Sequence, residues 1–193
     1  MTLYDLSMPA LTQALQNLAH LLEKAAGIAH AQGLAPAALL QRRLAPDMFP
    51  LALQVDILVS GTRGAAARLC GRLAPRDDSR EHAVFNRGSE AEFDPPAASF
   101  TELQASVEQA LSELKALSPA DVETAPDSLV SVAKPGNVRV FEARTFVLGY
   151  VLPNLYFHLT LVYALLRSAG IPLGKQDFEG SPAYRVVPDD LSG

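Results

Sequence analysis

An uncharged stretch near the C-terminus constrains this chain more than any other feature. From Thr145 to Leu166 the sequence holds no Asp, Glu, Lys or Arg, which is long enough for a helix that crosses a bilayer. Pro153, Asn154 and His158 fall near its middle, where a lone lipid-facing helix would leave polar groups without partners. We therefore predict the core helix of a bundle, wrapped by other amphipathic helices, and no membrane span.

The composition is that of one compact domain. The chain has 193 residues, of which 49% are hydrophobic and 19% are charged, enough for a single well-filled core. We expect one helical-bundle domain over residues 1–180 and a flexible C-terminal tail over residues 181–193.

Charge and cysteine usage argue against several classes of function. The net charge of -5 comes from 21 acidic and 16 basic residues without a Lys/Arg block, so we predict no nucleic-acid partner. No Lys or Arg precedes Lys24, as a secretory signal would require, and Cys70 is the only cysteine. These features favour a cytoplasmic protein.

Apolar residues at helical spacing predict four long helices. The third begins at a capping box, Ser99 to Glu102, in which each residue satisfies a backbone N–H of the other. Alternating residues on both sides of Gly136 predict a β-hairpin. The predicted helices cover about 7–33, 47–69, 99–117 and 143–169, and the hairpin strands cover 129–132 and 138–141.

Local signals complete the predicted fold. Ser7 and Asp47 are the expected N-caps of the first two helices. The charged segment 74–98 shows little periodicity, so we expect a long, mobile surface loop. The fold predicted is all-α: an up-down four-helix bundle with a small β-hairpin before the last helix.

Two motifs resemble those of a known family. They are LAPDMFP at 44–50 and LPNLYFH at 152–158, the second followed by YALLR at 163–167 and GKQDFEG at 174–180. With the hairpin, they are similar to an uncharacterised family, a domain of unknown function found in bacteria and fungi. That family looks like a branch of the DinB/YfiT-like superfamily of metalloenzymes. The resemblance implies a DinB-like bundle over about residues 1–180 and no established reaction.

The superfamily resemblance also implies a test for a metal. Its metal-binding members carry one histidine on the second helix and an H-x-x-x-H pair on the fourth. Here His158 has Asn154 four residues before it and Val162 four after it, and the second helix offers Gln54 and Asp56. The histidine triad is therefore not intact, and we predict no metal and no other cofactor.

A divalent metal at His158 is left as the weaker alternative. Its other ligands would be Asp47 and Asp56, since a catalytic metal usually has at least three protein ligands.

Five residues are candidates for a site between the helices. His158 would act as general base with Asp47 as a second catalytic group, and Asn154, Tyr156 and Tyr163 would contact a substrate. Each also has a structural interpretation. The histidine would bond to a facing helix, the aspartate would cap a helix, the asparagine would bond a backbone group freed by the preceding proline, and the tyrosines would anchor packing.

Two kinds of function remain open. The first is an enzyme or binding protein with a small-molecule pocket between the helices around His158. The second is a non-catalytic interaction or scaffold protein, a homodimer through helix faces. An open pocket that reaches His158 would favour the first, and a packed histidine bonded to protein would favour the second.

Overall fold

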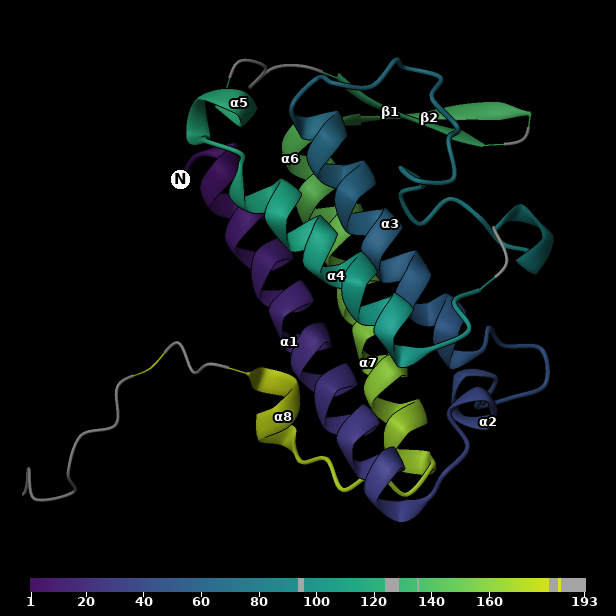
Figure 1. The fold of residues 1–193 in the computed structure, drawn as a ribbon. Coiled ribbons are helices and arrows are strands. Elements are labelled where there is room, and N and C mark those ends of the chain that lie inside the picture. The colour runs from purple at the N-terminus through teal and green to yellow at the C-terminus, as the bar shows by residue number, and fades with distance from the viewer. Residues whose placement is uncertain (94–95, 124–128, 135, 181–183, 185–193) are drawn as a thin grey trace, which may run out of the picture.

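The computed structural model describes residues 1–93, 96–123, 129–134, 136–180 and 184 (Figure 1). The helical fold with a small hairpin before the last long helix is confirmed. The tail predicted to be flexible lies outside the described residues except for position 184. In chain order the elements are α1 (Leu3–Gln32), α2 (Pro36–Leu40), α3 (Leu51–Leu69), η1 (Glu90–Glu92), α4 (Phe100–Lys115), α5 (Pro119–Glu123), β1 (Leu129–Lys134), β2 (Asn137–Glu142), α6 (Ala143–Thr145), η2 (Phe146–Val151), α7 (Leu152–Ser168) and α8 (Lys175–Glu179).

The long helices α1, α3, α4 and α7 enclose the core. Helices α4 and α7 each pack against both α1 and α3, so they lie on opposite sides of the bundle (Figure 1). On α1, steps of three and four residues place one row of side chains on the core face. The fully buried members of that row include Leu11, Leu15, Leu18, Leu22 and Ala25.

Helices α3 and α4 run in the same direction (Figure 1). Phe49, just before α3, packs edge-to-face on Phe93, which precedes α4. Cys70 and Leu117, each just past the end of its helix, line one groove. The bundle is therefore confirmed, whereas the predicted up-down alternation is not. Because a short turn cannot join parallel neighbours, residues 70–99 must travel back along the bundle.

Side-chain caps explain where α1 and α4 begin. Ser99 caps α4 as predicted, and its hydroxyl accepts the N–H of Glu102 at 3.1 Å. Helix α1 begins earlier than predicted because Thr2 and Asp5 form a capping box. Ser7, the predicted cap, lies buried inside the helix.

The prediction that Asp47 caps the second long helix is wrong. Helix α3 begins at Leu51, and its N-cap is Pro50. A residue before proline is disfavoured in the α conformation, which keeps Phe49 and the residues before it out of the helix. Asp47 lies instead in an exposed turn.

The last long helix consists of α6, the π-helical η2 and α7. The π-helical turn ends just before Pro153, which lacks the N–H that a regular helix would use. By length and composition, Ala143–Ser168 would suffice to cross a membrane. Its inner side nevertheless packs in the protein core, as predicted, through Leu155, Leu159, Val162 and Leu166.

The C-terminal motif ties α8 to α1. Lys24 Nζ and His20 Nε2 lie 2.8 and 3.0 Å from Asp177 Oδ1. The backbone N–H of Gly174, together with Lys24 and His20, holds the pKa of Asp177 well below its usual range. The motif therefore has a structural role.

Candidate functional site

His158 is the polar centre of the seam between α3 and α7. Its side chain is buried, and Nδ1 lies 2.7 Å from Oε1 of Gln54 on the facing helix. The Gln54 amide nitrogen donates to the carbonyl of Phe49 at 3.3 Å, which fixes Oε1 as the acceptor. His158 therefore donates from Nδ1. Its predicted bond to a facing helix is confirmed.

The same contacts define the chemistry of the imidazole. Burial lowers the pKa of His158 from 6.5 to about 4, so the ring is neutral at pH 7. With the proton on Nδ1, Nε2 carries the lone pair of the ring. His158 can thus accept one further hydrogen bond.

A segment that we call the strap, residues 77–93, covers this seam. The Phe85 ring stacks on the His158 imidazole, with centroids 5.6 Å apart and planes 8° from parallel. Phe85 has a positive φ of 55°, and it is the only non-glycine residue in the described ranges with a positive φ. A left-handed backbone costs an ordinary residue about 1–2 kcal/mol. Gly61 of α3 leaves room for the ring, because a Cβ there would collide with it.

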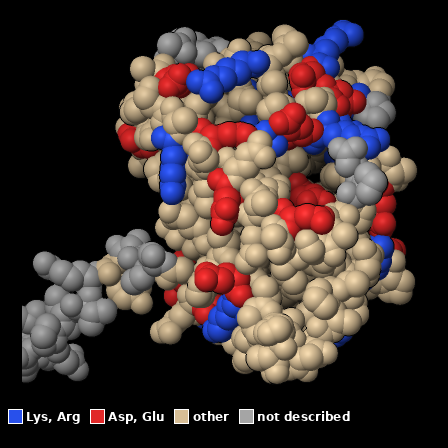
Figure 2. Space-filling model, in the orientation of Figure 1, with Lys and Arg blue, Asp and Glu red and all other residues tan. Residues whose placement is uncertain are grey.

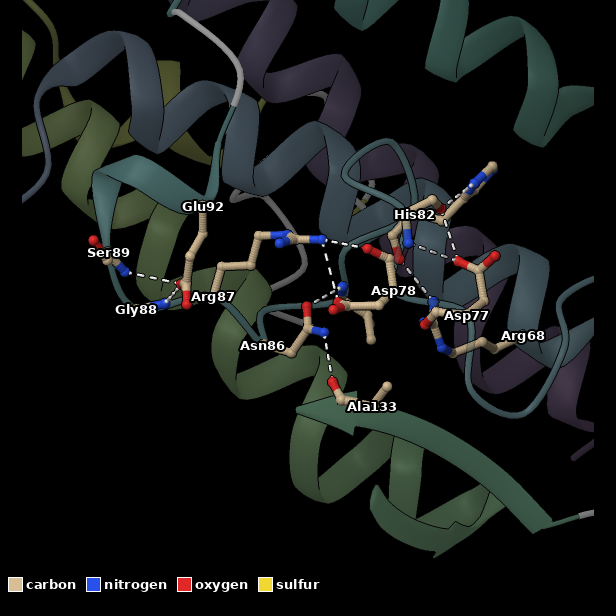
Figure 3. A network of polar contacts seen from close by, with 12 residues as sticks. Arg68, Asp77, Asp78, His82, Asn86, Arg87, Gly88, Ser89, Glu92 and Ala133 are labelled. Carbon is tan, nitrogen blue, oxygen red and sulfur yellow. Dashed lines mark hydrogen bonds and ion pairs between the residues drawn. The ribbon is translucent and has the colours of Figure 1, made fainter. Parts of the chain in front are cut away.

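Arg68 anchors the strap to α3 (Figure 3), and it also bonds the hairpin. From α3, its guanidinium donates to the carbonyls of His82 at 2.7 Å, of Asp77 at 3.1 Å and of Ser131 at 3.1 Å. A fourth donation, to Gly64 within the helix, spans 3.1 Å. Burial disfavours the charged form of Arg68 and lowers its pKa. The hydrogen bonds to four carbonyl groups offset this cost of burial.

Two more side chains hold the middle of the strap. Asn86 accepts the N–H of Val84 at 3.0 Å and donates to the carbonyl of Ala133 at 2.8 Å (Figure 3). The Tyr150 hydroxyl lies 2.9 and 3.0 Å from the carbonyls of Val84 and Phe85. Val84 is fully buried. The expected surface loop is therefore wrong for this part, because side chains far away in the sequence satisfy its backbone.

A cavity of about 20 Å³ remains between the strap, α3 and α7, and His158, Phe85 and Arg87 are among its lining residues. Arg87 donates from Nη2 to the carbonyl of Asp78 at 2.6 Å. Its Nε is buried and has no hydrogen-bond partner within the described residues. One water needs about 10–15 Å³ of such space, so the cavity has room for little else.

The other predicted site residues do not gather around this cavity. Asn154 donates to the carbonyl of Tyr150 at 2.7 Å, which is a backbone bond but not one to the carbonyl at 149 that the proline leaves without its helical donor. Tyr156 is 47% exposed on the outer side of α7. The Tyr163 ring packs edge-to-face on Phe178 of α8. Asp47 lies in its exposed turn, so the cavity predicted to join these residues is not the one at His158.

The residues around His158 do not fit a histidine-held metal. Gln54 occupies the facing position on α3 and bonds the imidazole directly, and Asn154 is committed to a carbonyl. The described part of the chain holds no cluster of three or more His, Cys, Asp or Glu side chains that could bind a metal.

Two larger grooves, of about 330 and 350 Å³, lie on either side of Arg63 between α3 and α4. Arg63 pairs with Glu81 of the strap, and its Nε lies 2.7 Å from Oε2 of Glu113 on α4. Burial raises the pKa of Cys70, which lines the smaller groove, so its thiol stays protonated at neutral pH.

The contacts that close the seam were missed at the sequence level. Phe85 and Arg68 belong to no local motif, and their partners lie on other elements, on α7 for Phe85 and on the strap and β1 for Arg68. Gly61 and Gly64, two glycines inside a predicted helix, were the available signal. Glycine inside a helix often marks a close approach by another segment.

Comparison with known proteins places the fold. The model of a family described as a domain of unknown function (DUF1993) matches residues 3–179. The chain is also similar to the crystal structure of a DinB family member protein from Shewanella denitrificans. The two are 28% identical with a TM-score of 0.75, and the match covers 96% of each chain. No curated protein matches the sequence.

Proposed function

Since this chain belongs to the DUF1993 family, a DinB-like family of unknown function, we propose that it is a non-catalytic interaction protein. It forms a homodimer through the outer face of η2 and α7. The packed state of His158 supports this function over a small-molecule enzyme. Its cavity is water-sized, the ring is bonded to Gln54, and Phe85 closes the approach.

The observation that carries the proposal is an exposed, uncharged helix face. Leu148, Tyr156 and Phe157 are 46%, 47% and 56% exposed. No charged residue lies between Arg144 and Arg167. Only 39% of the most apolar window of this helix is buried. Exposed aromatic side chains grouped on one face are typical of protein interfaces.

A second copy of the chain suits this face better than a membrane surface does. A twofold interface sets the same patch against itself, and a patch without charges does not repel its copy. Tyr156 and Phe157 lie at the midpoint of Ala143–Ser168, so antiparallel copies that cross there would overlap along the whole face. The net charge of -5 opposes binding to anionic lipid.

The mass of the protein in solution tests the proposal. We expect light scattering after gel filtration to give twice the 20.6 kDa of one chain. Tyr156→Lys with Phe157→Lys should give the monomer, because two charges would then face two more across the twofold axis.

The matched control adds the same charges to the opposite side of the bundle. Ala105→Lys with Ser112→Lys changes exposed residues of α4 and should leave the dimer intact. A wild type that is monomeric at its highest soluble concentration contradicts the proposal. So does a wild type that floats with lipid vesicles through this face. The predicted cytoplasmic location and the absence of a nucleic-acid partner stay predictions.

A further inference from the structure

We propose that Phe85 occupies a binding site for a small aromatic ligand, a single ring with a hydroxyl group such as a phenol. The ligand ring would take the place of the Phe85 ring on His158. This site goes beyond the dimer proposed above and does not depend on it.

The shape of the site is that of a slot for one ring. The His158 imidazole forms one wall, parallel to the Phe85 ring within 8°. Gly61 contributes a second wall, because it has no side chain and a Cβ there would collide with the Phe85 ring. Stacked rings at such a spacing attract each other beyond their buried area.

The polar end of the slot contains an arginine N–H that phenylalanine cannot satisfy. Arg87 Nε is buried and has no hydrogen-bond partner within the described residues, and the hydrogen bond described for the His158 ring is at Nδ1, which leaves Nε2 as its accepting nitrogen. Both residues line the small cavity beside the Phe85 ring. A hydroxyl accepts one hydrogen bond and donates another, so a phenol can complement the arginine and the histidine together. The phenylalanine ring can do neither.

The backbone of Phe85 makes its departure easier than that of an ordinary core residue. Its φ of 55° strains a residue that has a Cβ, and such strain collects at functional positions. A return of Phe85 to the usual region would relieve the strain and withdraw the ring. Arg87 would stay in place through its bonds to Asp78.

Phenol and toluene are the matched probes. Both carry one ring of similar size, and only phenol has the hydroxyl. In Phe85→Gly the competing ring is gone and glycine adopts the positive φ without strain. We expect phenol to bind this variant at least about tenfold more tightly than the wild type, and about tenfold more tightly than toluene, as for one satisfied polar pair. Calorimetric titration measures both ratios.

A conservative variant and the wild type guard against misfolding of Phe85→Gly. Arg87→Lys keeps the charge beside Asp78 but lacks Nε, so it should lose the preference for phenol over toluene. In the wild type, phenol should shift the NMR signals of the Gly61 amide and the His158 ring. The proposal is overturned by equal affinities for phenol and toluene in folded Phe85→Gly. It is equally overturned by wild-type signals that phenol leaves unchanged.

Discussion

A helix at the surface of a bundle usually turns apolar side chains inward and polar ones outward. Helix α4 follows this rule, whereas α7, on the opposite side of the bundle, departs from it on both of its sides. Helix α7 turns its polar His158 inward and its large apolar Tyr156 and Phe157 outward. Helix α4 turns only apolar side chains inward and places charged ones outside. Its buried residues are Phe100, Leu103, Val107, Ala110 and Leu114.

The outer face of α4 needs nothing but water. Glu102, Glu108 and Lys115 are exposed on this helix. In Figure 2, acidic and basic side chains gather over the upper and middle parts of the face on which α4 lies. The difference teaches that the polar residue on the inner side of α7 is covered by the strap, in addition to the neighbouring helices. It also suggests a partner for its outer side.

The largest effect should come from the anchor of the strap. Arg68→Leu leaves several buried carbonyls without donors, so we expect the free energy of unfolding to fall by about 3–5 kcal/mol. Urea unfolding measures it. Arg72→Leu is the control, because Arg72 is 55% exposed and pairs with Asp121 at the surface, where a pair contributes about 0–1 kcal/mol. Equal losses in both variants would mean that the hydrogen bonds of Arg68 to the strap contribute no more to stability than the surface ion pair of Arg72.

The buried histidine should make stability depend on pH. Between about pH 6.5 and pH 4 the unfolded chain takes up a proton at this position while the folded chain does not, because burial lowers the pKa of His158 to about 4. Stability therefore falls as the pH falls, by about 3 kcal/mol over this window. His158→Gln should lack this component. Unfolding curves of both proteins across the window should diverge toward lower pH, and parallel curves would show that the ring is hydrated.

Gly61→Ala should lower the stability of the protein, because the new side chain would clash with the strap. A Cβ at position 61 meets the Phe85 ring, and overpacking of this kind costs about 1–3 kcal/mol. In the Phe85→Gly background the same change should cost nothing, which a double-mutant cycle would reveal as coupling. Gly27→Ala is the control, since nothing lies near that position and alanine favours the helix. Additive losses would place the ring elsewhere.

The smallest effect on the isolated chain should come from the outer side of α7. Phe157→Ser removes an aromatic ring that is 56% exposed and packs edge-to-face on His158, so we expect the monomer to lose no more than about 1 kcal/mol of stability. Urea unfolding at low protein concentration measures this value. A loss of several kcal/mol at every concentration would show that Phe157 belongs to the core of a single chain.

Local signals predicted the elements well where one segment decides its own structure. The capping box at Ser99 and the alternation around Gly136 place α4 and the hairpin within a few residues. The start of α1 at Thr2 was missed because a later serine and proline looked like a first turn. The bond between His158 and Gln54 followed from the expectation that a buried imidazole finds a partner on a facing helix.

The strap could not be predicted because its order comes from distant partners. Charged residues without periodicity look like solvated loop, and nothing within 74–98 announces that Arg68 or Tyr150 will satisfy its carbonyls. The direction of α4 was missed for the same reason. A long connection can lead to a helix that runs parallel or antiparallel to the preceding one, and packing decides between the two directions.

The parallel course of α3 and α4 sets a minimum length for the chain between them. Helix α3 has 19 residues and so spans about 28 Å, which about nine extended residues could cover. Residues 70–99 exceed that requirement roughly threefold. Evolution could therefore shorten this connection and still close the bundle, but the shortened protein would leave the imidazole facing solvent. Relatives with the same four helices but connections of different length could thus differ in whether solvent or a ligand reaches the position of this imidazole.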